Sequence, residues 1–207
     1  MTQDADLVRQ RLALPGGELR VLQPRESAEL PDDGPVEWAP LVPYWSVLWR
    51  SGVALARELG AERLAGLRVV ELGCGLAVPS LVAARAGAAV LATDGSPEAL
   101  ALAERNAREN GLHVTTARAD WSDPGELAAR GPFDLAVAAD VLYEEDSVEP
   151  LLALLPRLAT AAWIADPGRP AAAGFLERAG AGWGVTTSVR DGVAIHRLSA
   201  AGERGPA

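Results

Sequence analysis

The sequence predicts an α/β domain built on a doubly wound, mostly parallel sheet, and three observations carry that prediction. Short apolar runs alternate with helical patterns five times between residues 67 and 180. These runs are continuously apolar, which is typical of strands buried on both faces of a sheet. Finally, Asp191 and Gly192 separate two strand-like runs, and such an Asp-Gly pair indicates an antiparallel hairpin at the C-terminal end.

The segment before the first βα step is expected to hold little regular structure. Residues 1–17 lack strong periodicity and are interpreted as a loose arm, and residues 18–24 as a short strand. Residues 26–40 are rich in acids, prolines and glycines and are interpreted as a loop. Residues 43–60 have apolar side chains at helical spacing and end on a glycine, so they predict a helix. The predicted organisation is an N-terminal arm with a short strand and loop (1–42), one domain (43–199) and a loose tail (200–207).

The βα steps follow one another without a second-domain boundary. The helix over 96–111 has the clearest start signal, because Ser96 suits the N-cap, Pro97 the first helical position and Glu98 the first turn. The expected strands are 67–72, 88–94, 113–120, 133–140 and 161–167. The expected helices are 77–87, 96–111, 123–130, 147–159 and 171–180. The closing hairpin is expected over 182–190 and 193–199.

Length, charge and cysteine content exclude several classes of protein. A chain of 207 residues suits one domain. Its net charge of −9 disfavours nucleic-acid binding, which needs clustered basic residues. No apolar run is long enough to span a bilayer, the start of the chain is polar and acidic, and one cysteine cannot form an internal disulfide. We therefore expect a cytoplasmic protein without nucleic-acid or membrane partners.

Two further points follow from residue types. All 19 basic residues are arginine, so the chain has no lysine of its own to modify. His113, His196 and Cys74 lack metal-ligand spacing, so no metal site is expected.

The stretch VVELGCGLAVPS is typical of a loop that binds a nucleotide-like cofactor. Gly73 and Gly75 lie where the first strand of the βα series turns into its helix, and glycine there permits positive φ and close approach of a ligand. A dinucleotide-binding fingerprint would place a third glycine at Val78. Because that glycine is missing and Glu71 adds an acid, the loop favours a cationic ligand such as S-adenosylmethionine (SAM) over a pyrophosphate.

Acidic side chains also end the next two predicted strands. Asp94 stands 21 residues after Gly73, where a carboxylate can accept both ribose hydroxyls, a demand shared by NAD and SAM. Asp120 ends the following strand, where an adenine edge would lie, and Trp121 beside it can stack on the ring or wall it off. Together these strand ends indicate a nucleoside site.

At this point the sequence resembles a known family. The motifs that carry the resemblance are PYWSVLWRSGVALA, VVELGCGLAVPSLVAARAGAAVLATD, ADWSD, AADVLYEEDSVEPLL and IADPGRP, between about Pro43 and Pro170. They resemble the class I, seven-β-strand SAM-dependent methyltransferases. Within these the chain is similar to the group that includes the protein-lysine methyltransferases acting on electron-transfer-flavoprotein β-subunit and on valosin-containing protein.

The resemblance implies a seven-stranded Rossmann-like methyltransferase sheet, SAM as the cofactor and S-adenosylhomocysteine (SAH) as its product. The departure from the family pattern is Ala77, where relatives commonly have a third glycine; alanine is expected to be tolerated if its φ is negative. Cys74 is expected to contribute its backbone rather than a reactive thiol. The implied cofactor contacts are Trp49, Glu71, Gly73, Cys74, Gly75, Asp94, Asp120, Trp121 and Ala139.

Asp140 and Tyr143 are implied to face the methyl acceptor. If their segment forms a helical turn, both side chains share a face. Asp140 is assigned to capture and orient an amine, and Tyr143 to wall the pocket and offer a hydrogen bond or an aromatic face. The expected acceptor is a protein lysine, with a small amine as the alternative, and the expected assembly is a monomer or small homo-oligomer.

Two other classes of function stay open from the sequence. An NAD(P) oxidoreductase is disfavoured by the missing third glycine, by the lack of hydride-transfer residues and by the antiparallel tail. A SAM-binding module without catalysis is the other alternative. SAM-dependent transfer to an amine is the leading prediction.

Overall fold

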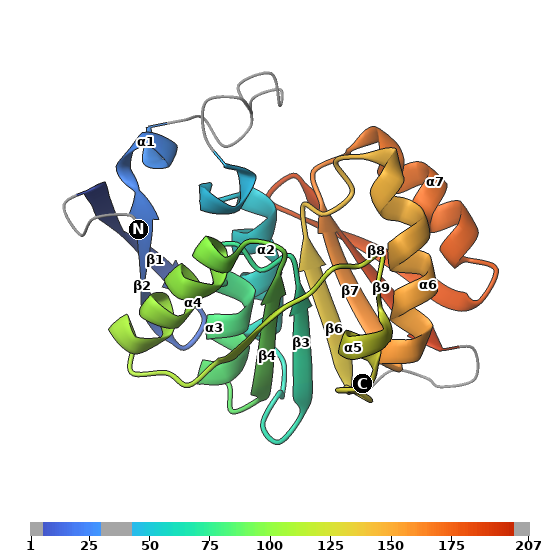
Figure 1. Cartoon of the computed structure of the whole chain (residues 1–207), viewed down its shortest axis with the longest axis horizontal. Helices are drawn as coiled ribbons and strands as arrows, with labels where there is room; N and C mark the ends of the chain where they lie inside the picture. Colours follow the sequence, from blue (N-terminus) through green and yellow to red (C-terminus); the bar gives the residue numbers. More distant parts are fainter. Residues whose placement is uncertain (1–5, 30–42, 201–207) are drawn as a thin grey trace.

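A seven-stranded sheet with the order β5-β4-β3-β6-β7-β9-β8 forms the centre of the molecule (Figure 1). The structure, a computed structural model, describes residues 6–29 and 43–200. Strands β3 to β7 run parallel to one another, whereas β9 is antiparallel to both β7 and β8. The strands are β3 (Arg68–Leu72), β4 (Ala89–Asp94), β5 (Thr115–Arg118), β6 (Leu135–Ala139), β7 (Ala161–Asp166), β8 (Trp183–Arg190) and β9 (Val193–Ala200).

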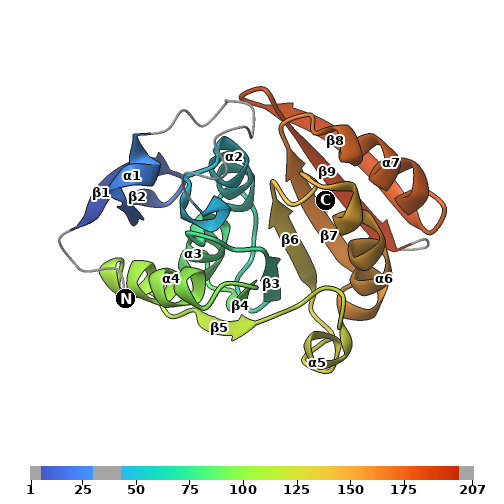
Figure 2. The same cartoon turned by 45° about the horizontal axis from the view of Figure 1, so that its top comes forward.

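Helices cover both faces of this sheet (Figure 2). Buried apolar residues of α2, α3 and α4 form one hydrophobic cluster with one face, and those of α5, α6 and α7 form a second cluster with the other. This confirms the predicted doubly wound fold. The helices are α2 (Arg50–Leu59), α3 (Val78–Arg85), α4 (Pro97–Glu109), α5 (Gly125–Ala128), α6 (Val148–Leu158) and α7 (Pro170–Ala179).

Local signals in the sequence fall where they were expected. The side chain of Ser96 accepts a hydrogen bond from the N–H of Ala99 and caps α4, whose first residue is Pro97. Asp191 and Gly192 have φ of 51° and 76° and join β8 to β9. Positive φ at both central residues is what a tight hairpin turn of this hand requires. The predicted C-terminal hairpin is therefore confirmed.

The N-terminal arm is the first place where the structure differs from the prediction. Instead of a loose arm, Leu7–Leu14 form strand β1, which pairs antiparallel with β2 (Gly17–Pro24), the predicted short strand. The interrupted apolar pattern of β1 concealed it, because its stability comes from pairing rather than from burial of one face. A turn at Pro15 and Gly16, where Gly16 has φ of 83°, joins the two strands.

This hairpin packs on α4 through side-chain amides. The N–H of Leu22 donates to Oδ1 of Asn106 at 2.7 Å, and Nδ2 of Asn106 donates to the carbonyl of Leu22 at 3.3 Å. Asn110 makes the equivalent pair of bonds with the backbone of Arg20. Asn106 also donates to the carbonyl of Leu76 at 3.1 Å. The edge of β2 is therefore tied both to α4 and to the segment that follows β3.

The predicted helix over 43–60 is also different, because it is broken. A short 3₁₀ turn, η3 (Tyr44–Ser46), precedes α2, and the backbone is extended at Val47 and at Trp49, the N-cap of α2. Ser46 donates its hydroxyl to the carbonyl of Pro43, which closes the turn before the helix starts. The apolar spacing across this segment was therefore interpreted as one helix although it belongs to two elements.

Some expectations fall on residues outside the described ranges. The predicted loop over 26–40 begins with α1 (Arg25–Ala28), and residues 30–42 lie outside these ranges, as do 201–207 of the predicted tail. Within the described ranges, no helix is long and apolar enough to cross a membrane.

The topology determines where a ligand site can form. From β3 the chain continues to β4 and β5 on one side, and it then crosses to β6 and β7 on the other. The loops after β3 and β6 therefore leave the sheet in opposite directions, and a crevice opens at their carboxyl ends.

Candidate functional site

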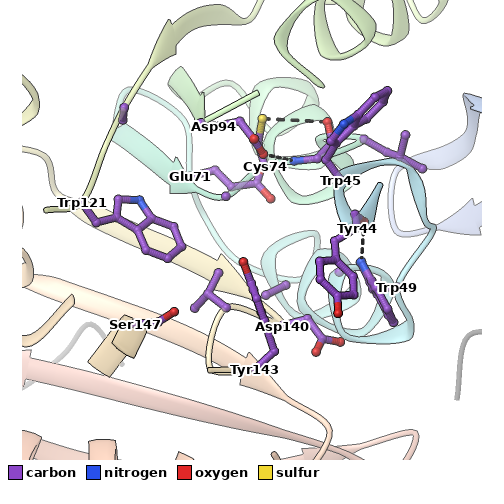
Figure 3. A pocket seen from close by; sticks show the side chains of 18 of the residues that line it. Tyr44, Trp45, Trp49, Glu71, Cys74, Asp94, Trp121, Asp140, Tyr143 and Ser147 are labelled. Atoms are coloured by element: carbon purple, nitrogen blue, oxygen red, sulfur yellow. Dashed lines mark hydrogen bonds between the residues drawn. The ribbon is translucent and has the colours of Figure 1, made fainter. Parts of the chain in front are cut away.

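A cavity of about 580 Å³ lies at the carboxyl ends of the parallel strands (Figure 3). This size falls within the range of small-ligand sites, which is roughly 300–1,000 Å³. All the residues predicted from the sequence to form the site line it, although they come from five separate segments of the chain. These residues are Trp49, Glu71, Gly73, Cys74, Gly75, Asp94, Asp120, Trp121, Ala139, Asp140 and Tyr143.

The loop after β3 forms a close-fitting wall that only glycine can make. Gly73 and Gly75 have φ of 66° and 48°. A Cβ at Gly75 would lie 2.9 Å from the carbonyl oxygen of Trp45, and a Cβ at Gly73 would lie 3.2 Å from the side chain of Val141. Both positions therefore need glycine for conformation and for space.

Ala77 has φ of +63°, so the condition of negative φ, under which it was expected to be tolerated without strain, is not met. It is fully buried and is the N-cap of α3. An alanine in this left-handed conformation is strained by roughly 1–2 kcal/mol. Residue 77 therefore adopts the left-handed backbone conformation although it is an alanine and not a glycine, which would adopt that conformation without strain.

Glu71 is a buried carboxyl group at the base of the cavity. Its Oε2 accepts a hydrogen bond from the N–H of Ser80 at 2.9 Å, in the first turn of α3. Burial raises the pKa of Glu71 to about 8, the bond from Ser80 opposes the rise, and the charge of Asp94 adds to it. At neutral pH this carboxyl is therefore mostly protonated unless a cation enters the cavity.

Asp94 ends β4 and reaches across to the loop after β3. The N–H groups of Gly75 and Ser96 donate to its two carboxylate oxygens, both at 2.9 Å. Burial raises the pKa of Asp94, and these backbone bonds oppose that rise. The carboxylate therefore fixes the glycine loop while it lines the cavity.

Asp120 and Trp121 follow β5, which ends at Arg118, two residues earlier than predicted. Oδ1 of Asp120 accepts hydrogen bonds from both the backbone N–H and the hydroxyl of Ser122, and these bonds lower the pKa of Asp120. The ring of Trp121 lies 3.3 Å from where a Cβ at Gly73 would be. Trp121 thus closes the side of the cavity opposite α2 (Figure 3).

Asp140 stands at the other end of the cavity, where β6 ends. It has φ of +58°, a conformation that aspartate tolerates better than most residues. Its Oδ1 accepts a hydrogen bond from Nε of Arg169 at 2.8 Å and forms an ion pair with Nη2 of Arg169, also at 2.8 Å. Its Oδ2 accepts a hydrogen bond from the hydroxyl of Ser51 at 3.0 Å. The carboxylate is therefore held from two sides.

Tyr143 lies on an irregular segment rather than on the helical turn that was considered from the sequence. The residue is 41% exposed, and it lies at the mouth of the cavity beside Asp140 (Figure 3). The centroid of the Tyr44 ring lies 5.3 Å from that of Tyr143 and 6.4 Å from that of Trp49. Three aromatic rings thus surround the end of the cavity that Asp140 lines.

Sequence reasoning missed three residues at this end. Arg169, Ser51 and Tyr44 had no role assigned, yet they contact Asp140 or Tyr143. Arg169 belongs to IADPGRP, and Tyr44 and Ser51 belong to PYWSVLWRSGVALA, motifs that carried the resemblance, so the signal for all three residues was present. Arg169 lies 29 residues and Ser51 lies 89 residues from Asp140 along the chain, so no local pattern predicts that either side chain contacts Asp140.

Other reactive groups contribute little to this site. Cys74 is buried, and burial raises the pKa of its thiol well above the usual range, which disfavours a reactive thiolate. Its N–H donates to the carbonyl of Thr93 at 2.8 Å, so its backbone ties the glycine loop to β4. Among residues 6–29 and 43–200, no group of three metal-ligating side chains is close enough to hold an ion.

Comparison with solved structures places the fold among methyltransferases. Magnesium protoporphyrin IX methyltransferase from Synechocystis PCC 6803, solved with bound SAM, superposes with a TM-score of 0.60 at 22% identity, covering 73% of this chain and 79% of that one. Ribosomal protein L11 methylase from Lactobacillus delbrueckii subsp. bulgaricus gives 0.56 at 23% identity, covering 70% and 77%. At such identities the likeness concerns the fold alone.

Sequence comparison gives nearer relatives. The chain is 34% identical over 122 residues to protein N-lysine methyltransferase METTL21A of Danio rerio, covering 56% of each chain. It is 33% identical over 176 residues to electron transfer flavoprotein beta subunit lysine methyltransferase of Mus musculus, covering 78% of this chain and 64% of the relative. It is 32% identical over 114 residues to histone-arginine methyltransferase METTL23 of Homo sapiens, covering 52% and 60%.

The chain thus spans between about half and two thirds of the length of these relatives. The family model described as lysine methyltransferase matches residues 45–163, which is more than half of the chain. That match includes the glycine loop, Tyr143 and the acids at the ends of the predicted strands, Asp94, Asp120 and Asp140. The resemblance drawn from the motifs is therefore confirmed. The protein belongs to the lysine methyltransferase family.

Proposed function

We propose that the protein transfers a methyl group from SAM to an amine, and that the amine belongs to a lysine side chain of another protein. One observation carries the proposal. The carboxylate of Asp140 and the rings of Tyr44, Trp49 and Tyr143 line the same cavity as the glycine loop. A carboxylate among aromatic rings suits an alkylamine, because the rings attract a cation and accept its apolar stem. The names of the lysine-directed relatives support this acceptor.

The residues at the inner end of the cavity fit SAM. The glycine loop packs directly against the backbone of Trp45, since a Cβ at Gly75 would lie 2.9 Å from the Trp45 carbonyl oxygen. SAM carries an α-ammonium and a sulfonium but no phosphate, so bound SAM would place a positive charge in the cavity that the buried carboxyl of Glu71 lines. Asp94 has lone pairs for the ribose hydroxyls, and Trp121 offers a face for the adenine. The further residues proposed to hold SAM are Trp49, Gly73, Cys74, Asp120 and Ala139.

When bound, SAM supplies a methyl carbon that accepts the lone pair of the amine nitrogen, while the sulfur keeps the electrons of the broken bond and SAH remains. The chain's own task is positioning, because holding two reactants at near-attack distance supplies much of the acceleration. In this proposal Asp140 orients the amine, and Tyr143 walls the pocket. Burial and the charge of Glu144 raise the pKa of Tyr143, so its hydroxyl stays protonated and able to donate.

Incubation of the protein with methyl-labelled SAM and a cell extract tests the proposal. We expect radioactive methyl in a protein band and, after hydrolysis, in methyl-lysine. Because the chain contains no lysine, methyl-lysine in the digest cannot come from the enzyme itself. Asp140→Asn and Tyr143→Phe should each lower incorporation by about tenfold or more while SAH still binds.

Other results would point to the other candidates. Label found only in small molecules would indicate that the acceptor is a small amine rather than a protein. Label found in arginine would indicate that the acceptor residue is arginine rather than lysine. Binding of SAH without any transfer would indicate a SAM-binding module, and binding of NADH instead of SAH an oxidoreductase. If both variants kept full activity, the assignment of the acceptor end would be wrong. The cytoplasmic location and the monomer or small homo-oligomer stay predictions from the sequence.

A further inference from the structure

The proposed acceptor site contains a charge problem that the sequence leaves open. A lysine amine reacts in its neutral form, yet its ordinary pKa is about 10.4. A lone carboxylate within about 4–6 Å would favour the ammonium form and raise that pKa further. Asp140, if unpaired, would therefore bind the acceptor in the form that cannot react.

The structure shows that Asp140 is paired. Nε of Arg169 donates a hydrogen bond to Oδ1 and Nη2 of Arg169 forms an ion pair with the same oxygen, and the side chains of Arg169 and Asp140 are 17% and 4% exposed. An arginine side chain is always charged in proteins, so the pair has no net charge at any pH at which Asp140 is ionised. Oδ2 accepts from the uncharged Ser51 and is the oxygen farther from the guanidinium bonds.

The turn that follows β7 fixes the position of Arg169. Oδ1 of Asp166, at the end of β7, accepts from the N–H groups of Gly168 and Arg169, both at 2.7 Å. Asp166 is only 1% exposed, and Gly168 has φ of 99°, so this turn is tightly constrained. Arg169 is also the N-cap of α7, and its Cζ lies 5.6 Å from the centroid of the Trp49 ring. The side chain is thus directed into the cavity by backbone, carboxylate and ring together.

We propose that Arg169 is a positioning residue that compensates the charge of Asp140, so that the acceptor amine is oriented by an ion pair and enters the reaction deprotonated. The inference rests on the proposed transfer to an amine and adds the residue that sets the protonation state of the acceptor. The proton of the incoming ammonium passes to water before the nitrogen attacks. Oδ2 of Asp140 remains able to accept a hydrogen bond from the neutral amine.

Other charged or titratable groups face this pair from each neighbouring element. Asp166 on β7 lies near enough to Asp140 for their charges to interact, and His196 on β9 interacts with Asp166. Desolvation lowers the pKa of His196, so near neutral pH this histidine is mostly uncharged. The cavity wall adds Tyr44, Asp94, Tyr143, Glu144 and Asp146. The wall also contains Glu71, Cys74, Asp120 and a second cation, Arg118. Nε of Arg118 donates to the carbonyl of Gly95 at 3.2 Å, whereas Arg169 forms the ion pair with Asp140, so Arg169 is the cation that offsets the charge of Asp140.

Binding of n-butylamine, a mimic of the lysine side chain, to the SAH-loaded protein tests the inference without a known acceptor. The binding would be followed by NMR between neutral pH and about pH 10. For the wild type we expect affinity to rise with pH, because the neutral amine is preferred. Arg169→Gln should bind butylammonium about tenfold more tightly than the wild type near neutral pH, since one pKa unit corresponds to a factor of ten. Loss of a purely structural contact would weaken binding instead.

Methyl transfer to the protein fraction of a cell extract provides the second readout. Arg169→Gln should shift the pH midpoint of transfer upward by about one unit, with about tenfold loss near neutral pH and recovery at high pH. Arg169→Lys keeps the cation and should keep the wild-type midpoint. The double variant Asp140→Asn with Arg169→Gln should lose the gain in butylammonium affinity. Arg178→Gln is the matched control, because Arg178 lies on the same helix and pairs with Glu149 outside this cavity.

The outcomes separate the inference from the function on which it rests. If the wild type transfers methyl to protein but Arg169→Gln shows an unchanged midpoint and no gain in butylammonium affinity, the inference is overturned and the function stands. A loss of SAH affinity in Arg169→Gln would make Arg169 a cofactor ligand and also overturn it. If the wild type neither binds butylamine nor labels an amine, the proposed function fails, and the inference fails with it.

Discussion

At the scale of single residues, Glu71 is predicted to link cofactor binding to proton release. Its pKa of about 8 in the free protein comes from burial, and the α-ammonium of SAH would favour the ionised form. We expect close to one proton to be released per SAH bound near neutral pH, and affinity to rise as pH approaches 8. Calorimetry in two buffers of different ionisation enthalpy measures this release, and Glu71→Gln should abolish it. Equal heats in both buffers with the wild type would contradict the assignment.

The same carboxyl affects stability in the free protein. The folded-state pKa of Glu71 lies above the ordinary glutamate value of 4.5, so the folded state holds the proton more tightly than the unfolded chain. Its contribution to the free energy of unfolding is therefore greatest below about pH 4.5 and is lost as pH rises through about 8. Relative to the wild type, Glu71→Gln should lose less stability across that interval.

Ala77 provides a test of backbone strain. Ala77→Val would put a β-branched side chain at φ of +63° in a fully buried position, so we expect a loss of about 3 kcal/mol or more in the free energy of unfolding. Ala77→Gly is the matched control, because the relief of roughly 1–2 kcal/mol of strain offsets one lost methyl worth about 0.8 kcal/mol. Urea denaturation compares the three proteins. A valine variant as stable as the wild type would show that this turn relaxes.

At the scale of elements, Asn106 connects the N-terminal hairpin to the glycine loop after β3. This amide is fully buried and bonds both to the edge of β2 and to the carbonyl of Leu76. Asn106→Ala leaves buried backbone groups unpaired, each costing roughly 1–3 kcal/mol, so we expect a comparable loss of stability and weaker SAH binding. Both are measurable by denaturation and calorimetry.

Asn110→Ala is the matched control for this connection. Asn110 bonds to the backbone of Arg20 in the same way but at a half-buried position, and none of its bonds reaches the glycine loop. Its loss should cost less stability and leave SAH affinity unchanged. Equal effects of the two variants on SAH affinity would show that the hairpin acts on stability alone.

At the scale of the whole molecule, the cavity joins both halves of the sheet. It is lined from β3, β4 and the segment after β5 on one side, and from β6, its following loop and Arg169 on the other. A ligand bound there should therefore stabilise the folded chain as one unit. At a SAH concentration of about 100 times Kd we expect roughly 2.7 kcal/mol of stabilisation, or about 5–10 °C in Tm. Differential scanning calorimetry would contradict this if two transitions appeared and only one moved.

Much of this architecture was predictable, because parallel strands buried on both faces leave continuous apolar runs and their helices carry strong start signals. Ser96 and the pair of Asp191 and Gly192 act locally, so their outcome follows from a few neighbouring residues. Strand β1 was missed because its stability depends on its partner β2 and on amides from α4. The break between η3 and α2 was missed because apolar spacing does not report where the backbone becomes extended.

By itself, the sequence determined the doubly wound fold, the glycine loop and the acids at the strand ends, since each depends on residues adjacent along the chain. The tertiary structure decided what those groups contact. It placed Ala77 in a left-handed conformation, raised the pKa of Glu71 by burial, and joined Asp140 to Arg169 and Ser51. The physical reason is that desolvation and ion pairing depend on neighbours brought together by the crossover from β5 to β6, which no local pattern encodes.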